Sequence, residues 1–183
     1  LMITADSGDF YAKPSLSNAF AQRRAPTQLV STEAAKMAAA QNVTLLPHTR
    51  VAAIDAQAHS VRTAAGEHRY SQLVLATGAQ PIRVPLAGDG ADHVLSVNSL
   101  SDFTALHTRL ITQNNAEPKR VMIMGAGLIG CEFANDLAGA GLAVSVADPA
   151  DRPMAALLPP EASAQLKAAL SGLGVDWHLG GTV

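Results

Sequence analysis

Apolar residues in the second half of the chain alternate between short continuous runs and helical spacing. Residues 118–149 contain an apolar run, a glycine-rich turn, a helical stretch that Gly141 ends, and a second apolar run. Pro159 and Pro160 begin another helix, which ends at Gly174 before the strand-like VDWHL. This order of strand, helix, strand, helix and strand predicts a parallel sheet with helices packed on its faces.

The first half of the chain has shorter runs and predicts a more irregular mixture of elements. Residues 1–6 (LMITAD) predict a buried strand, and residues 16–22 predict a short helix. The stretch STEAAKMAAAQN predicts a longer helix, with Ser31 or Thr32 as its cap. A strand at VTLL and a small antiparallel meander over TRVAAIDA, SVRTAA and HRYS follow. QLVLATG is then expected to form a buried strand that runs into a turn.

An irregular segment separates the two halves of the chain. QPIRVPLAGDGADHV holds two prolines and two glycines without a regular period, which is typical of a segment that crosses between domains. Beyond it, the apolar spacing from Leu100 predicts a helix. We therefore expect an α/β protein with two Rossmann-like, three-layer dinucleotide-binding domains and a small antiparallel β-meander. The first domain is expected to cover residues 1–98 and the second residues 99–183, both incomplete.

Composition and charge argue against several other classes of protein. Hydrophobic residues make up 48% of the chain and charged residues 15%, which is typical of a soluble globular protein. The net charge of −2 offers no basic surface for nucleic acid, and no apolar run is long enough to cross a membrane. Cys131 is the only cysteine, and the six histidines are scattered. We therefore expect a cytoplasmic protein that binds neither nucleic acid nor metal.

The stretch GAGLIG is the strongest functional signal. Gly125, Gly127 and Gly130 fit the pattern G-x-G-x-x-G, in which the glycines permit a tight turn, a close approach of the backbone to a pyrophosphate, and packing of the helix on the strand. The phosphates would lie at the positive end of the helix that begins near Leu128. The main chain of this stretch, including Leu128 and Ile129, is therefore a candidate dinucleotide site.

Asp148 ends the second strand of the same unit. A carboxylate at this place can accept hydrogen bonds from a ribose 2′-hydroxyl and repels a 2′-phosphate, which favours NADH over NADPH. Arg152 lies close by in the sequence and would favour the phosphate instead. A Rossmann-type sheet without a nucleotide and a site for S-adenosylmethionine stay open as alternatives.

Two reactive residue types stand side by side on the predicted helix. Cys131 has no partner thiol, so its simplest interpretation is a small buried hydrophobic residue. Glu132 lies in the first turn, where the helix dipole favours a carboxylate. The spacing leaves open whether Glu132 serves only this purpose or points into the crevice beside the ligand.

The start of the chain repeats the pattern found around Asp148. LMITADSGDFYAKP and AVSVADPADRPM each contain a strand, a terminal acid, and a loop with a basic residue and a proline. Asp6 is therefore expected to bind the ribose of a second dinucleotide. Its own glycine motif would lie in about 30 residues before Leu1, the usual length of a βαβ unit.

The chain resembles the FAD-dependent pyridine nucleotide–disulfide oxidoreductase superfamily in its ATG turn and its GLIGCE stretch. Within it, YAKPSLS, HTRVAAID, YSQLVLATGAQPIRVP and GAGLIGCEFANDLAGAG are most similar to the rubredoxin–NAD reductases. The resemblance implies FAD contacts from Thr4, Ala5 and Asp6 at the adenosine end, from Lys13 on the flavin side, from the main chain of Val51 at the adenine, and from Thr77 and Gly78 beneath the cofactor.

The resemblance also implies that Glu132 reaches the junction of flavin and nicotinamide, and that Asp148 and the glycine motif hold NADH. Two features depart from the family pattern. Asn18 stands where related ferredoxin reductases carry a second basic residue, and AGDG at 87–90 is not the flavin motif of the family.

The implied reaction passes a hydride from NADH to FAD and then single electrons to a small iron protein. One cysteine cannot form the redox pair of the disulfide reductases, so electrons would leave the flavin directly for a docked carrier. Rubredoxin is the expected acceptor, and a ferredoxin of an oxygenase system is the alternative; a homodimer is a candidate assembly. The rival interpretation is a non-catalytic nucleotide-binding fragment. We expect this stretch alone to be inactive, because it lacks the first glycine loop and the C-terminal flavin segment.

Overall fold

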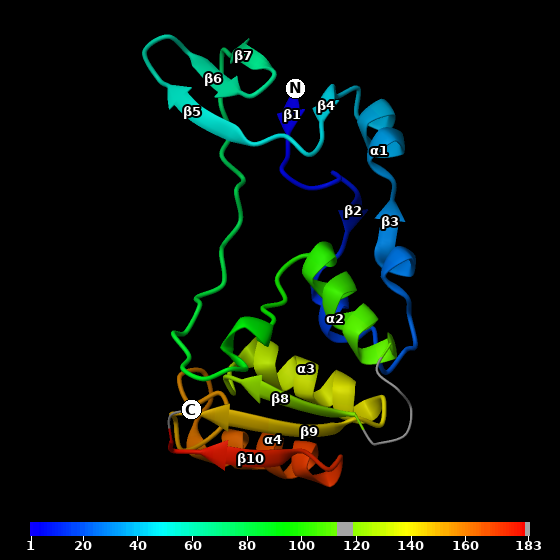
Figure 1. The fold of residues 1–183 in the computed structure, drawn as a ribbon, viewed down its shortest axis with the longest axis vertical. Helices are drawn as coiled ribbons and strands as arrows, with labels where there is room; N and C mark the ends of the chain where they lie inside the picture. Colours follow the sequence, from blue (N-terminus) through cyan, green and yellow to red (C-terminus); the bar gives the residue numbers. More distant parts are fainter. Residues whose placement is uncertain (113–118, 182–183) are drawn as a thin grey trace. The chain divides into compact units, whose positions relative to one another are not determined.

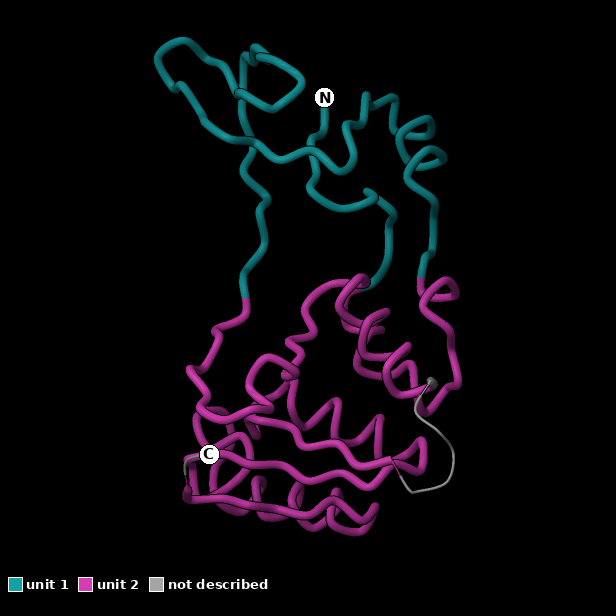
Figure 2. Tube along the Cα trace, in the orientation of Figure 1, with its two compact units in different colours: residues 1–12, 30–80 teal, residues 13–29, 81–183 magenta. Residues whose placement is uncertain are grey.

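The computed structural model describes residues 1–112 and 119–181. The chain divides into two compact units, which are shown in different colours in Figure 2. Unit 1 contains residues 1–12 and 30–80, and unit 2 contains residues 13–29 and 81–183. None of the helices in the described ranges is long and apolar enough to span a membrane.

The two units differ in extent from the two expected domains. Residues 13–29 and 81–98 group with unit 2, although the sequence suggested a boundary after residue 98. The physical reason is that residues 13–29 pack on two helices of unit 2 rather than on the strands of unit 1. The assignment of residues 1–98 to FAD and of residues 99–183 to NAD stays a prediction.

Unit 2 is built on a three-stranded parallel sheet in the order β10-β9-β8 (Figure 1). Its elements are β8 (Arg120–Met124), α3 (Leu128–Gly139), β9 (Ala143–Asp148), α4 (Pro160–Gly172) and β10 (Asp176–Leu179). The alternation of strands and helices predicted from the sequence is therefore confirmed. Both crossovers step in the same direction along the sheet, so right-handed connections place α3 and α4 on one face of it.

Apolar positions on α3 and β9 form the core of unit 2. Phe133, Ala134 and Leu137 are buried on α3, and Val144 and Val146 are buried on β9. Their burial follows the helical spacing on α3 and the alternation on β9. Each large side chain of this kind stabilises the fold by about 1.5–3 kcal/mol when it leaves water. This packing holds the start of α3 against the carboxyl end of the sheet.

Residues 13–29 and α2 (Leu100–Thr112) form a second part of the unit 2 core. The segment contains two short 3₁₀ helices, η1 (Lys13–Ser17) and η2 (Pro26–Leu29). Phe103 on α2 is fully buried, and its ring centroid lies 5.2 Å from that of Phe20. The helix predicted from Leu100 is therefore confirmed, and its apolar face covers residues 13–29.

The helix predicted over residues 16–22 is wrong. Residues 13–17 form a 3₁₀ helix, and turns follow. The carboxylate of Asp136 accepts hydrogen bonds from the backbone N–H groups of Phe20 (2.9 Å) and Ala21 (2.8 Å). These two donors are therefore not available to carbonyls one turn earlier, which an α-helix requires.

Unit 1 contains short strands around one helix. β1 (Met2–Ile3) pairs in parallel with β4 (Leu45–Leu46), and β2 (Phe10–Tyr11) pairs antiparallel with β3 (Val30–Thr32). The strands predicted at LMITAD and at VTLL are confirmed as β1 and β4, although Met2 is exposed rather than buried. Among the described residues, each of these four strands pairs with one other strand, so its second edge is not paired.

The predicted helix of unit 1 is confirmed as α1 (Ala34–Ala40), but its predicted cap is wrong. Ser31 and Thr32 lie in β3, and the N-cap Glu33 makes no capping hydrogen bond through its side chain. Instead, the carboxylate of Asp9 accepts a 2.8 Å hydrogen bond from the N–H of Ala34. A residue 25 positions earlier in the chain thus supplies the cap, which local sequence cannot reveal.

The antiparallel meander is confirmed. It consists of β5 (Val51–Asp55), β6 (Ser60–Thr63) and β7 (Gly66–Arg69), and β6 lies in the middle. The carboxylate of Asp55 accepts hydrogen bonds from the N–H groups of Gln57 and Ala58 in the first turn. This Asx-type turn connects the first two strands.

The buried strand expected at residues 72–78 is wrong. These residues form no strand, and Val74 is 85% exposed. A strand needs a hydrogen-bonded neighbour, and none of the strands in the described ranges pairs with this run. The turn expected at its end is not formed either, because residues 73–80 hold no turn, although Gly78 has φ +67°, a conformation that favours glycine. The irregular character of residues 80–94 is also confirmed, apart from the short η3 (Ala91–His93).

Candidate functional site

The glycine motif forms the turn that connects β8 to α3. Gly125 has φ +110°, and its N–H donates a 2.8 Å hydrogen bond to the carbonyl of Ala147 on the neighbouring strand. The chain then turns into α3 at Gly127, which has extended backbone angles and no side chain to cap the helix. The tight turn predicted at the first glycine is thus present, and the helix begins at Leu128 as expected.

The other two glycines of the motif differ in their surroundings. A Cβ on Gly130 would lie 1.9 Å from the carbonyl oxygen of Gly125, so no larger residue fits without moving the backbone. A Cβ on Gly127 would meet no protein atom within 4 Å. Gly130 is therefore required by the packing of the helix on the turn, whereas the space beside Gly127 is open. That open space fits the approach of a ligand such as a pyrophosphate.

The first turn of α3 faces this open space without a protein anion to cap it. Gly127 supplies no side-chain acceptor, and the first turn holds no acidic residue. The expectation that Glu132 lies in the first turn is wrong, because α3 begins at Leu128 and Glu132 is its fifth residue. The backbone N–H groups at the start of a helix carry a partial positive charge and bind anions well. The side chains of Leu128 and Ile129 are both exposed beside them. The arrangement is suited to the phosphate groups of a dinucleotide.

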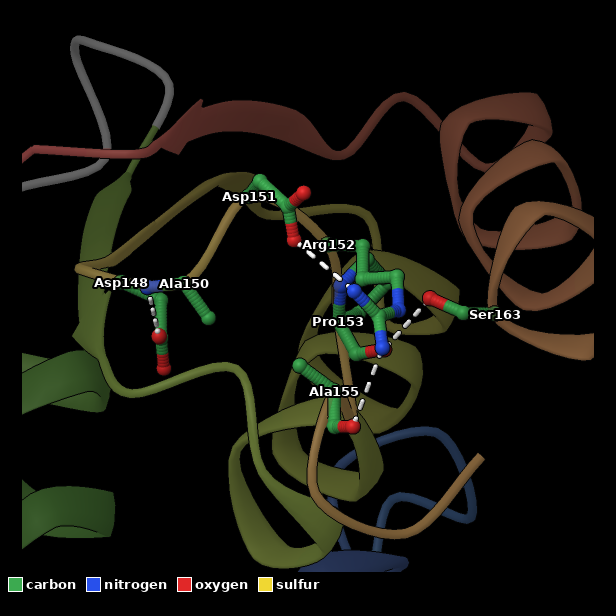
Figure 3. A network of polar contacts seen from close by, with 7 residues as sticks. All are labelled: Asp148, Ala150, Asp151, Arg152, Pro153, Ala155 and Ser163. Atoms are coloured by element: carbon green, nitrogen blue, oxygen red, sulfur yellow. Dashed lines mark hydrogen bonds and ion pairs between the residues drawn. The ribbon is translucent and has the colours of Figure 1, made fainter. Parts of the chain in front are cut away.

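Asp148 connects the end of β9 to the glycine turn. One carboxylate oxygen accepts a 2.6 Å hydrogen bond from the N–H of Ala126, and the other accepts a 2.7 Å hydrogen bond from the N–H of Ala150. Figure 3 shows the second of these contacts. The carboxylate therefore holds the turn, and its contact with a ribose stays a prediction. Each oxygen keeps a second lone pair for a ligand hydroxyl.

Arg152, the residue that would favour a 2′-phosphate, is engaged within its own loop. One guanidinium nitrogen lies 3.1 Å from the carboxylate of Asp151, and another donates to the carbonyl of Ala155 at 3.3 Å (Figure 3). The N–H of Met154, two residues further, donates a 2.7 Å hydrogen bond to the carbonyl of Ala126. The loop thus closes onto the glycine turn, with the arginine bound to acceptors of its own loop. This arrangement is consistent with the expected preference for NADH, which stays a prediction.

Asp6 in unit 1 is built like Asp148 in unit 2. Its carboxylate accepts hydrogen bonds from the N–H of Gly8 at 3.0 Å and from the hydroxyl of Thr4 at 2.6 Å. Asp6 follows β1 by three residues and Asp148 ends β9, and each carboxylate accepts a hydrogen bond from the N–H two residues later. The repeat read from the sequence is present in the local structure. Ala5, between Thr4 and Asp6, is exposed.

The remaining residues expected at FAD lie apart from the glycine turn along the chain. Val51 begins β5. Thr49, two residues before Val51, donates a hydrogen bond through its N–H to the carbonyl of Thr4. Thr77 and Gly78 are exposed in the irregular segment after the meander. Lys13 is exposed at the start of η1 in unit 2. Their contacts with FAD stay predictions.

Glu132 makes a specific contact beyond its place near the helix start. Its Oε2 accepts a 2.6 Å hydrogen bond from the hydroxyl of Ser17, which is buried at the end of η1. One turn later on α3, Asp136 binds the backbone of residues 20 and 21. Sequence analysis missed both Ser17 and Asp136. The sequence shows only that Glu132 and Asp136 are spaced i and i+4 on one helix. It does not show which groups these two carboxylates bind.

Cys131 behaves as the structural residue that its isolation suggested. Its thiol is buried, and Sγ lies 3.4 Å from the carbonyl of Ala126. Burial, together with the negative charge of Asp148, raises the pKa of the Cys131 thiol. A protonated, buried thiol is a poor nucleophile. Cys131 therefore contributes packing beneath the glycine turn.

A pocket of about 420 Å³ lies between α3 and α4 in unit 2. Most of its walls are apolar side chains, with Leu128 and Met154 near the glycine turn. Glu132 and Asn135 are its polar lining residues, and Cys131 also lines it. The pocket thus adjoins the candidate nucleotide site and shares Glu132 with it.

A parallel sheet with a glycine turn, an open helix start and a strand-end acid defines a dinucleotide-binding protein. The chain belongs to the pyridine nucleotide-disulphide oxidoreductase family, whose pattern matches residues 1–183. It is 41% identical to the rubredoxin-NAD(+) reductase of Acinetobacter baylyi over 100% of this chain and 47% of that protein. It is also 41% identical to a nitric oxide reductase FlRd-NAD(+) reductase of Klebsiella pneumoniae, over 97% of this chain and 45% of that protein.

A solved structure shows the same architecture. The ferredoxin reductase of Rhodopseudomonas palustris superimposes with a TM-score of 0.83 and 29% identity, over 98% of this chain and 44% of that one. The expected α/β fold of Rossmann type is therefore confirmed. The chain spans about half the length of the curated relatives that it matches.

Proposed function

We propose that the full-length protein is a flavoprotein reductase that oxidises NADH and passes electrons to rubredoxin. The observation that carries the proposal is the turn at Gly125–Gly130, where the backbone leaves open space beside Gly127 and Asp148 stands at the end of the next strand. This combination fits a dinucleotide and favours a free ribose 2′-hydroxyl. Similarity to a rubredoxin-NAD(+) reductase along the whole chain supports the choice of acceptor.

The residues of unit 1 fit a role in holding FAD. Asp6 presents a carboxylate whose second oxygen, Oδ2, has no hydrogen-bond partner in the ranges that the structure describes. Thr4 and Ala5 directly precede it, and the N–H groups of His48 and Thr49, just before Val51, donate to the carbonyls of Asp6 and Thr4. Thr77 and Gly78 would turn the chain beneath the cofactor. FAD, when bound, supplies the acceptor of a hydride and the donor of single electrons.

The part of this chain in the reaction is to bind and orient. The start of α3 would hold the pyrophosphate, Asp148 the ribose, and Glu132 the edge of the nicotinamide. Lys13 would lie on the flavin side. Cys131 takes no part, because it is buried and its thiol pKa is raised. We place the protein in the cytoplasm, where NADH and a reduced thiol are both expected.

Gly127→Ala tests the nucleotide site without disturbing the fold. The added methyl group enters space that no protein atom occupies, and φ of −76° suits alanine. We expect an unchanged melting temperature and a Kd for NADH raised about tenfold or more, because the methyl group fills the place of a phosphate oxygen. Gly139→Ala, in the last turn of the same helix, is the matched control and should bind NADH normally. Normal NADH binding by Gly127→Ala would contradict the proposed site.

The reaction itself is tested with the full-length protein. Anaerobic NADH should bleach bound flavin, NADPH should do so much more slowly, and the reduced protein should then reduce rubredoxin. If the purified protein contains no flavin, or if NADH does not reduce its flavin, the proposed function is wrong. The protein would then be a non-catalytic nucleotide-binding protein. Ferredoxin is the second candidate acceptor, since a ferredoxin reductase shares this fold at 29% identity. Faster reduction of ferredoxin than of rubredoxin would select it.

A further inference from the structure

The hydroxyl of Ser17 has a choice of two acceptors and one proton to donate. It lies 2.6 Å from Oε2 of Glu132 and 3.2 Å from the carbonyl oxygen of Pro14. The shorter distance is typical of a hydrogen bond from a hydroxyl to a charged carboxylate, which is about twice as strong as a neutral one. The proton therefore goes to Glu132. Because Ser17 is 8% exposed, water competes little for this bond.

The position of Ser17 does not depend on Glu132. Asp136, which is 1% exposed, anchors the same segment by binding the N–H groups of Phe20 and Ala21. The ring of Phe20 also packs against Phe103 on α2. The segment is thus fixed from two sides, and the hydroxyl of Ser17 is held at a constant place next to α3. The flexible partner in the contact is the glutamate side chain.

Glu132 has three rotatable bonds and lies only half-buried. Its Oε1 has no hydrogen-bond partner in the ranges that the structure describes, so the bond from Ser17 to Oε2 is what restrains the carboxylate. A restrained carboxylate with one free oxygen is suited to hold a ligand group in one orientation. Without the restraint, the carboxylate would sample several rotamers before it met the ligand.

We propose that Ser17 is a positioning residue for Glu132: it fixes Oε2 and leaves Oε1 for the nicotinamide. This inference rests on the proposed function, in which Glu132 contacts the junction of flavin and nicotinamide. Ser17 touches neither reacting group and acts only through the carboxylate. Its hydroxyl, and not its volume, carries the effect.

The test is a double-mutant cycle on the full-length holoenzyme, with Ser17→Ala, Glu132→Gln and the two combined. Stopped-flow reduction of the flavin over a range of NADH concentrations gives the rate at saturation and the Kd separately. We expect Ser17→Ala to slow reduction at saturation about tenfold, as the loss of one charged hydrogen bond predicts. In the Glu132→Gln background the same substitution should have little further effect, because the carboxylate is already absent.

Two further variants separate the hydroxyl from the packing. Ser17→Cys keeps nearly the same volume but donates a much weaker hydrogen bond, so it should fold normally and reduce the flavin slowly. Ser15→Ala is the matched control in the same 3₁₀ helix and should leave the rate unchanged. If Ser17→Ala has a lower flavin content or melting temperature, the reduction rate of Ser17→Cys decides whether the hydroxyl is needed, because that variant preserves the packing.

The outcomes distinguish this inference from the proposed function. Wild-type rates in Ser17→Ala and Ser17→Cys, together with slow reduction in Glu132→Gln, would overturn the role of Ser17 alone. Additive effects in the double variant would also overturn it, because Ser17 would then act independently of Glu132. A wild-type rate in Glu132→Gln, or a flavin that NADH does not reduce, would instead refute the proposed role of the site.

Discussion

Replacing Asp148 with asparagine tests whether this carboxylate holds the glycine turn in addition to binding a ribose. Its two oxygens accept hydrogen bonds from Ala126 at 2.6 Å and Ala150 at 2.7 Å. Asparagine keeps one acceptor and turns an NH₂ group toward the other N–H, so one bond is lost and two donors face each other. The charge, which strengthens both bonds, is lost as well.

The expected loss of stability follows from these two bonds. A hydrogen bond to a charged group contributes about 1.5–3 kcal/mol, and Asp148 is half-buried, so we expect the lower half of that range. For a chain of this size, about 2 kcal/mol corresponds to a melting temperature lower by roughly 4–8 °C. The loss should occur without any nucleotide present, because the contacts lie within the protein.

Thermal melts of the nucleotide-free protein, followed by circular dichroism, give the comparison. Asp151→Asn is the matched control, since the side chain of Asp151 is 80% exposed and pairs with Arg152 at the surface. Its melting temperature should change by about 1–2 °C at most, as expected for a surface ion pair. If Asp148→Asn melts like the wild-type protein, or if Asp151→Asn is equally destabilised, the carboxylate does not hold the turn.

Three further substitutions test other parts of unit 2. Gly130→Ala should lower the melting temperature and weaken NADH binding, because its Cβ would lie 1.9 Å from a backbone oxygen, whereas Gly139→Ala should melt at or above the wild-type temperature. Asp136→Asn should destabilise the fold by about 2–3 kcal/mol in urea titrations, since it weakens two buried hydrogen bonds, and an unchanged midpoint would contradict this. Burial lowers the pKa of His107, so unfolding takes up a proton and the free energy of unfolding should fall as the pH drops below 6.5. His107→Phe should show less of this loss in melts at about pH 7 and pH 5, while His178→Gln, at an exposed site, should keep it.

The sequence alone determined the parallel sheet of unit 2. Its strands and helices follow local patterns: apolar runs at β8 and β9, helical spacing on α3, and glycines at the stops. Gly141 and Gly174 end helices with φ of +87° and +88°, which glycine adopts without steric cost. The turn at Gly125 and the close packing at Gly130 were also readable, because a glycine turn between a strand and a helix has one common geometry. The contact of Asp148 with a ribose stays a prediction.

Only the tertiary structure decided what the acidic residues bind. Asp9 caps α1 from 25 positions away, and Asp136 reaches a segment 115 positions earlier in the chain. These contacts explain why the predicted caps at Ser31 and Thr32 failed and why residues 16–22 form no α-helix. A distant carboxylate that accepts a hydrogen bond from a backbone N–H takes the place of a local acceptor and so changes the local structure. The position of the carboxylate in the sequence does not reveal which N–H it will bind.

The segment 72–78 shows the same limit for strands. Its composition is that of a buried strand, yet it is exposed and irregular, because strand formation depends on a neighbour to pair with. Ser17 shows it for the site: only folding brings this serine, at the end of η1, to 2.6 Å from Glu132. Local sequence patterns thus predict elements whose hydrogen bonds form within a helical turn or between successive strands. Contacts between residues a hundred positions apart depend on how the chain packs, which local patterns do not show.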